Sequence, residues 1–146
     1  MFDNYWINLI FRLSLSLLVG GVIGWERELR HKPAGFRTHM LVSFGAAVFV
    51  LIAIELKSSQ PDADSISRVI QGITTGIGFL GGGEILREGQ SKSGAIRIRG
   101  LTSAAAIWVS AALGVAAGCG LWQLSLVGTF LCILVLRVFK RWENEA

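Results

Sequence analysis

The sequence predicts an all-α integral membrane protein, a bundle of about five transmembrane helices that forms one domain over residues 1–146. Hydrophobic residues make up 52% of the chain and charged residues 16%, and the mean hydropathy is +0.56. This composition is typical of membrane proteins. The apolar residues fall into runs close to the roughly 20 residues that cross a bilayer. The basic residues gather between alternate runs.

Five spans are expected, at about residues 6–25, 40–56, 66–86, 101–117 and 121–139. The first is expected to be a true span and not a cleaved signal peptide. Asp3 stands where a basic leader is needed, Arg12 interrupts the apolar run, and no small-residue cleavage site follows. The alternative has four spans with the first helix on the membrane surface, and it would leave this first apolar run unexplained.

Loop charges predict the orientation of the spans. Segments 26–39 and 87–100 each hold four basic residues, and three more lie near the end of the fifth span. In the other two connections, Lys57 is the one basic residue. Because Lys and Arg mark the cytoplasmic side, the N-terminus is expected outside and the C-terminus in the cytoplasm.

Small residues spaced four apart predict how the spans pack. Such residues line one face of a helix and let two backbones approach closely in a membrane. The first, third and fourth spans carry these ladders, and we therefore expect them to form the tight centre, with the fifth span facing lipid. The ladders are Ser16–Gly20–Gly24, Gly72–Gly76 with Gly78–Gly82, and Ala106–Ser110–Gly114–Gly118.

The third span is the most informative run, because it combines six glycines with polar residues that hydrophobicity alone does not require. It resembles the first span in direction and in its small-residue ladder, which suggests a parallel internal repeat; coincidence between glycine-rich helices is the alternative. Side-by-side packing of the two spans would create a polar membrane seam, whereas Arg68 could instead extend to the headgroups. The seam residues are Arg12, Arg68, Gln71 and Thr75.

Glu26 and Glu84 are the candidate cation ligands, since they follow Gly-x at the cytoplasmic ends of the first and third spans. Mg²⁺ keeps much of its water and is often held by one or two carboxylates. No cofactor is indicated with certainty, and Mg²⁺ is the ion that this pair could hold. The alternative is that both carboxylates form solvated ion pairs with nearby arginines.

An enzyme and a nucleic-acid-binding protein are both disfavoured. The Gly76–Gly81 stretch matches G-x-G-x-x-G only inside an apolar span, not in the strand-to-helix turn that binds dinucleotides. His31 and His39 lack the spacing of a zinc site. The net charge of +4 comes from residues that flank apolar spans, so it is better explained by the cytoplasmic membrane face than by a nucleic acid. Cys119 and Cys132 are expected to be free thiols.

Several motifs, in order and over nearly the whole chain, resemble those of the MgtC/SapB family. They begin with Gly24-Trp25-Glu26-Arg27-Glu28 and Gly35-Phe36-Arg37-Thr38-His39, continue with the glycine-rich run 71–83, and end with 99–105 and 106–114. The family-motif and packing residues on this resemblance are Gly24, Gly35, Arg37, Thr38, Gly76, Gly78, Gly81, Gly82, Gly100, Thr102 and Ser110.

The resemblance implies a multi-pass protein of the bacterial inner membrane, linked to growth at low magnesium and, in pathogens, to survival in macrophages. It implies a non-catalytic factor in ion homeostasis that contacts copies of itself or a membrane partner such as the proton-translocating ATP synthase or a cation pump. The alternative is a cation transporter that uses the third span, Glu26 and Glu84. Two departures bear on the virulence role: the ACT-like C-terminal domain of virulence members is expected to be absent, and Thr102 and Val109 stand where an Asn and a Cys are expected.

Overall fold

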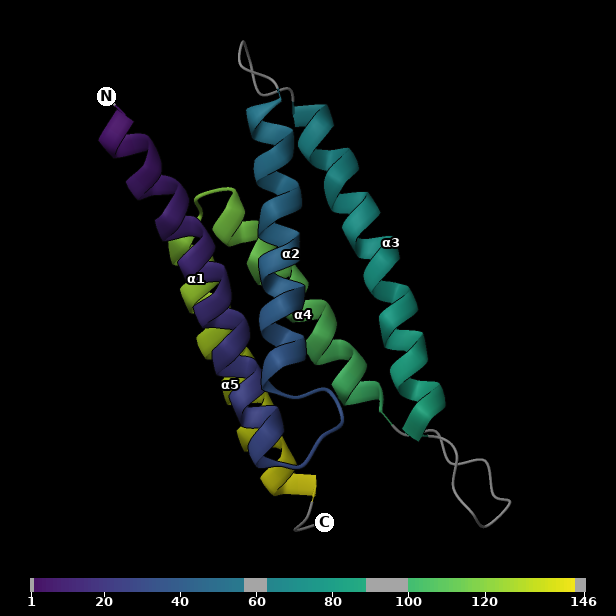
Figure 1. Ribbon diagram of the computed structural model, residues 1–146. Helices are drawn as coiled ribbons and strands as arrows, with labels where there is room; N and C mark the ends of the chain where they lie inside the picture. Colours follow the sequence, from purple (N-terminus) through teal and green to yellow (C-terminus); the bar gives the residue numbers. More distant parts are fainter. Residues whose placement is uncertain (1, 57–62, 89–99, 144–146) are drawn as a thin grey trace.

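The computed structural model describes residues 2–56, 63–88 and 100–143, and all five predicted helices are present in them (Figure 1). Four helices are long and apolar enough to cross a membrane, and the apolar part of the last, Trp122–Val138, is shorter. The helices are α1 (Phe2–Leu29), α2 (Phe36–Glu55), α3 (Ala63–Glu88), α4 (Leu101–Gly118) and α5 (Trp122–Glu143).

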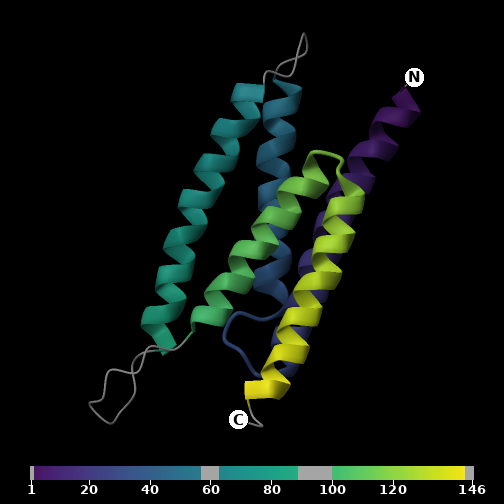
Figure 2. The same cartoon turned by 180° about the vertical axis from the view of Figure 1, so that it is seen from behind.

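The helices alternate in direction along the chain. α1, α3 and α5 run one way and α2 and α4 the other, so the α1–α2 loop and the C-terminus lie at the same end of the bundle (Figures 1 and 2). This is the arrangement that the charge pattern requires, although the side of the membrane at which this end lies stays a prediction. The basic segment 89–99 and the connection 57–62 lie outside the described residues.

α1, α2 and α4 form the centre of the bundle. Glycines of α1 and α4 lie directly against the α2 backbone: a Cβ added at Gly24 would lie 2.7 Å from Phe36 Cα, and one at Gly118 would lie 2.8 Å from the Ala47 carbonyl oxygen. Cβ atoms essentially never come this close to another heavy atom, so these positions require glycine. The ladders predicted on the first and fourth spans are therefore packing surfaces, and the helix between them is α2.

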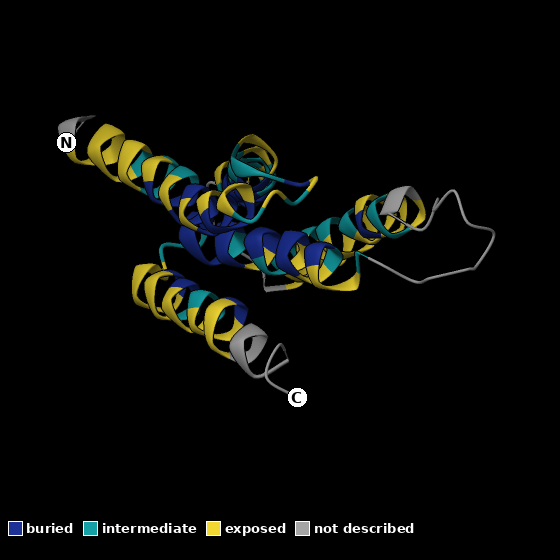
Figure 3. Cartoon of the chain, turned by 90° about the horizontal axis from the view of Figure 1, so that it is seen from below, coloured by how far each residue is buried: buried dark blue, intermediate teal, exposed yellow. Residues whose placement is uncertain are grey.

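The prediction that the third span belongs to this centre is wrong. α3 contacts α4 and α2, and no described residue pair joins α3 to α1. Only 6% of its apolar window is buried, compared with 56% for α4, and the buried residues gather in the middle of the bundle (Figure 3). Ser43 and Ala47 of α2 are also small residues four apart, but this single pair is shorter than the ladders of the other spans, so the role of α2 was not predicted. Its buried small residues are Ser43, Ala46 and Ala47.

α5 packs against α1 and α4 by one side (Figure 2). The Ser125 hydroxyl donates a hydrogen bond of 3.1 Å to the Leu113 carbonyl of α4, and Leu136 joins the apolar core. The large apolar side chains on its other side, such as Phe130, are exposed. This is the surface expected of a helix that faces lipid.

Candidate functional site

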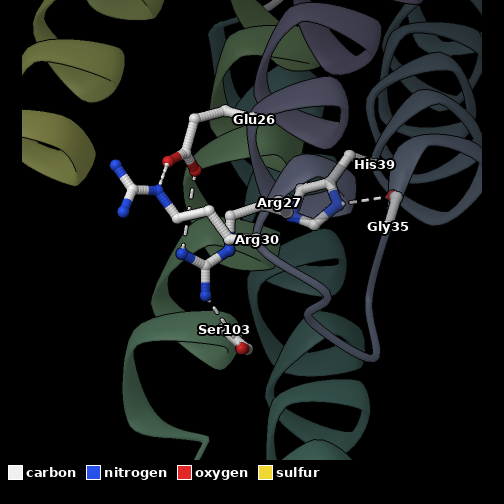
Figure 4. Close-up of polar contacts among 6 residues, drawn as sticks. All are labelled: Glu26, Arg27, Arg30, Gly35, His39 and Ser103. Atoms are coloured by element: carbon white, nitrogen blue, oxygen red, sulfur yellow. Dashed lines mark hydrogen bonds and ion pairs between the residues drawn. The ribbon is translucent and has the colours of Figure 1, made fainter.

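A buried group of charged residues lies where α1 meets α2 and α4, at the end of the bundle that carries the α1–α2 loop (Figure 4). It forms because α1 continues as a helix to Leu29, beyond the predicted end at residue 25. Glu26 and Arg27 are each only 2% exposed. Glu26 Oε2 lies 3.8 Å from Arg27 Nη1, and Arg30 Nε donates a hydrogen bond of 2.5 Å to Glu26 Oε1.

This cluster links α1 to α4. Arg27 Nη2 donates a buried hydrogen bond of 3.0 Å to Ser103 Oγ, which joins α1 to the first turn of α4. Buried charges are retained only when paired and hydrogen-bonded, because taking an ion out of water costs several kcal/mol. One carboxylate faces two guanidinium groups here, so the cluster carries a net positive charge. The geometry therefore favours an ion-paired lock over the cation-binding role predicted for Glu26.

His39 lies beside the cluster on α2 and is fully buried. Its Nδ1 is 2.9 Å from the Gly35 carbonyl oxygen, and since a carbonyl only accepts, Nδ1 must carry the hydrogen. Nε2 has no hydrogen-bond partner among the described residues, and neither do the hydroxyls of Ser43 and Ser110. These atoms extend the polar region from the cluster into the contact between α2 and α4.

The loop into α2 is fixed by Glu28. The Phe36 backbone N–H donates a hydrogen bond of 2.8 Å to Glu28 Oε2, which satisfies a free donor at the start of α2 and places a negative charge at the positive end of the helix dipole. Glu28 Oε2 occupies the space that a Cβ at Gly35 would need. A side chain at residue 35 would therefore displace this carboxylate from its hydrogen bond to the Phe36 N–H.

The other motif residues near this end play different roles. Gly100 begins α4 with a φ of 87°, a left-handed conformation that favours glycine. Arg37, Thr38 and Thr102 have exposed side chains, so they are available to the surroundings of the bundle. Three motif segments that lie far apart in the sequence, around residues 24–28, 35–39 and 100–103, therefore meet at one end.

The second candidate cation ligand, Glu84, lies on α3. It is partly buried, and its Oε1 atom is buried without a hydrogen-bond partner in the described part of the chain. No contact recorded for the described residues joins it to Glu26, and no group of three or more His, Cys, Asp or Glu residues among them could hold a metal ion. A two-carboxylate Mg²⁺ site therefore stays a prediction.

The predicted polar seam is divided between two separate places. Arg12 donates a hydrogen bond of 3.1 Å from Nη1 to the Gly118 carbonyl oxygen at the end of α4. The Arg68 side chain on α3 is 78% exposed, and its Nη2 atom lies 3.8 Å from Asp64 Oδ2. Gln71 is exposed, and the Thr75 hydroxyl donates to the Gln71 carbonyl oxygen of its own helix. The expected juxtaposition of Arg12 and Arg68 is wrong, because α1 and α3 do not touch.

The glycines of α3 lack a partner of their own within the chain. A Cβ at Gly81 would make an ordinary contact of 3.4 Å with Ala104 Cβ, but one at any of the others would meet no atom within 4 Å in the described structure. The packing role predicted for these positions is not met inside one chain, and it stays a prediction for a contact with another molecule. These open positions are Gly72, Gly76, Gly78, Gly82 and Gly83.

Ion pairs between Glu26 and the nearby arginines were the alternative predicted from the sequence, but as solvated pairs, whereas here Glu26 and Arg27 are buried. His39 and Ser103 were not predicted as members of a site. Arg27 and Arg30 were assigned to a cytoplasmic loop, where positive charge is common. The spacing of Glu26 and Arg30 by four residues was the available signal, because such pairs lie on one helix face. Ser103 and His39 gave no signal without knowledge of which helices meet.

Comparison with known proteins identifies the family. The sequence profile of the MgtC family matches residues 13–145. Protein SrpB of Synechococcus elongatus is 48% identical and the match covers 97% of this chain and 80% of SrpB. The “Putative magnesium transporter YhiD” of Escherichia coli K12 is 40% identical over 90% of this chain and 60% of YhiD. Protein MgtC of Brucella abortus is 45% identical over 84% of this chain, which spans only 48% of that relative. No solved structure matches.

Proposed function

Since this chain belongs to the MgtC family, we propose that it is a non-catalytic factor of magnesium or ion homeostasis in the bacterial inner membrane, acting through helix–helix contacts with a second copy or another membrane protein. The observation that carries the proposal is the uncovered glycine surface of α3. Here, the “glycine surface” means Gly72, Gly76 and Gly83 on one side of α3 together with Gly78 and Gly82, which lie roughly 120° around the helix. Added Cβ atoms at these five positions meet nothing within 4 Å in the described structure.

The free-energy cost of glycine in a helix favours a helix–helix contact at this surface. Each glycine in a helix interior costs about 1 kcal/mol relative to alanine, and lipid gives nothing in return for that cost. Close packing of two helices offsets this cost, because it brings the two backbones together and gains dispersion contacts. The same chain uses Gly24 and Gly118 in this way against α2, so the glycine surface has the chemistry of a packing face without its partner.

The ion pairs of the charged cluster support a regulatory factor over a carrier. Glu26 is buried and faces Arg27 and Arg30. A divalent cation approaching Glu26 would therefore be repelled by two positive charges or would have to displace them. Transport of Mg²⁺ is the second candidate. It is favoured by the buried Oε1 atom of Glu84 and by the name of YhiD as a magnesium transporter.

Gly78→Leu is expected to abolish growth support at low magnesium while leaving the fold of the isolated chain intact. A leucine side chain at Gly78 has open space within the chain, but it would keep a partner helix from approaching. Complementation of a strain lacking the gene, at matched protein levels, measures the first effect, and thermal unfolding in detergent measures the second.

Val127→Phe is the control, because Val127 is 57% exposed on α5 and the substitution adds bulk to a surface assigned to lipid. It is expected to support growth like the wild type. Normal growth with Gly78→Leu would remove the basis for a functional contact at the glycine surface.

A further inference from the structure

A polar pocket lies at the end of the bundle opposite the charged cluster, between the start of α1 and the end of α2. Its volume is about 340 Å³, within the range of about 300–1,000 Å³ that small-molecule sites occupy. Asn4, Asn8 and Arg12 line it from α1 and Glu55 lines it from α2, together with apolar side chains such as Leu51. Asn4, Asn8 and Arg12 are four residues apart, so they form one polar ladder on a single face of α1.

The two charged groups of the pocket retain binding capacity. The Arg12 guanidinium has five N–H donors, and among the described residues it makes one side-chain hydrogen bond, to the Gly118 carbonyl oxygen. The Glu55 carboxylate is exposed and lines the pocket beside Tyr5. A positive and a negative group on separate walls suit a ligand that carries both charges.

The length of α4 indicates the depth of this pocket in the membrane. α4 has 18 residues and is therefore about 27 Å long, close to the roughly 30 Å of the hydrocarbon core. The turn after Gly118 is irregular backbone, which membrane proteins keep out of contact with the hydrocarbon of the bilayer, and so belongs near the interface. Arg12 contacts this turn through Gly118 and Gly120, which puts the pocket at the level of the lipid headgroups.

We propose that this pocket binds the phosphoethanolamine headgroup of a bilayer phospholipid. The phosphate would accept hydrogen bonds from the Arg12 guanidinium, whose planar fork suits phosphate oxygens, with the Asn4 and Asn8 amides as further donors. The ammonium group would pair with Glu55. Leu51 precedes Glu55 by one helical turn, so the apolar lining lies on the side of the pocket nearer the hydrocarbon core of the bilayer. The acyl chains of a bound lipid must extend in that direction.

Native mass spectrometry of the full-length protein in detergent, with added phosphatidylethanolamine or phosphatidylglycerol, tests the proposal. The protein is expected to retain phosphatidylethanolamine about tenfold better, since a charge-assisted hydrogen bond contributes roughly that factor. Glu55→Gln is expected to remove the preference, because phosphatidylglycerol lacks the ammonium group. Arg12→Gln is expected to weaken retention of both lipids about tenfold. Lys32→Gln, at the other end of the bundle, is the control and is expected to behave like the wild type.

Glu55 is exposed at the end of its helix, so its variant should fold even if Arg12→Gln weakens the contact with α4. Equal retention of the two lipids by the wild type, or an unchanged preference in Glu55→Gln, would overturn the proposal. Soluble glycerophosphoethanolamine serves as a competitor. Failure to displace the lipid at equal concentration supports a lipid site, whereas full displacement would overturn the lipid as the source of the headgroup.

Discussion

Replacing Gly114 by leucine is expected to prevent α2 and α4 from packing and to leave little folded protein. The Cβ alone would overlap the Ser43 carbonyl group of α2, which cannot move aside as a flexible side chain can. We expect a loss of at least about 3 kcal/mol in the free energy of unfolding, the upper range for overpacked cores. Size-exclusion chromatography in detergent and thermal unfolding would measure the loss.

Gly45→Leu is the matched control for this experiment, because Gly45 lies on α2, the helix that Gly114 contacts, yet a Cβ added at Gly45 would meet no atom within 4 Å. It should elute and unfold like the wild type. A Gly114→Leu protein with the elution volume and midpoint of the wild type would show that α2 and α4 do not approach as closely as described.

Arg27→Met is expected to give the second largest loss of stability. The substitution removes the hydrogen bond to Ser103 and takes one of two positive partners from the buried Glu26. Removal of one member of a buried ion pair costs about 3–5 kcal/mol, largely because the other charge is left in an apolar environment. Arg30 still faces Glu26, so we expect a value near the lower end of that range, measured by thermal or denaturant unfolding in detergent.

Two further variants separate the parts of this effect. Ser103→Ala removes only the hydrogen bond between α1 and α4 and should cost about 1 kcal/mol. Arg30→Met should cost about 1 kcal/mol or less, because its side chain is 31% exposed and water can replace it. If Arg27→Met were no more destabilising than Arg30→Met, the cluster would be a surface ion pair and not a lock between helices.

The helices could be predicted from the sequence, whereas their neighbours could be predicted only in part. Hydrophobic runs and basic loops gave five helices of alternating direction, and the ladders of α1 and α4 are packing surfaces, as expected. The α3 ladders have the same pattern but touch no other described helix, and Gly72 and Gly76 line a cavity beside α2. Small residues report that two backbones can approach; they do not report whether the second backbone belongs to the same chain.

The charged cluster shows a different limit. Arg27 and Arg30 agree with the positive-inside rule, and their ion pairing with Glu26 was the predicted alternative to a cation site, but the burial of Glu26 and Arg27 between helices was not predicted. The length of α1 decides this burial: had the helix stopped at residue 25, the three side chains would lie in a loop. Helix ends are the least certain part of a sequence-based prediction, because a turn of extra helix costs little free energy.

Mg²⁺ uptake into proteoliposomes that contain only this chain distinguishes a regulatory factor from a magnesium transporter. We expect uptake equal to that of empty liposomes under an inward Mg²⁺ gradient, monitored with an enclosed Mg²⁺-sensitive dye, for wild type and Glu84→Gln alike. Functional protein in the same preparation would be verified by its unfolding midpoint and its retained lipid. Uptake by the wild type that is lost in Glu84→Gln would contradict the account and establish the chain as a magnesium transporter.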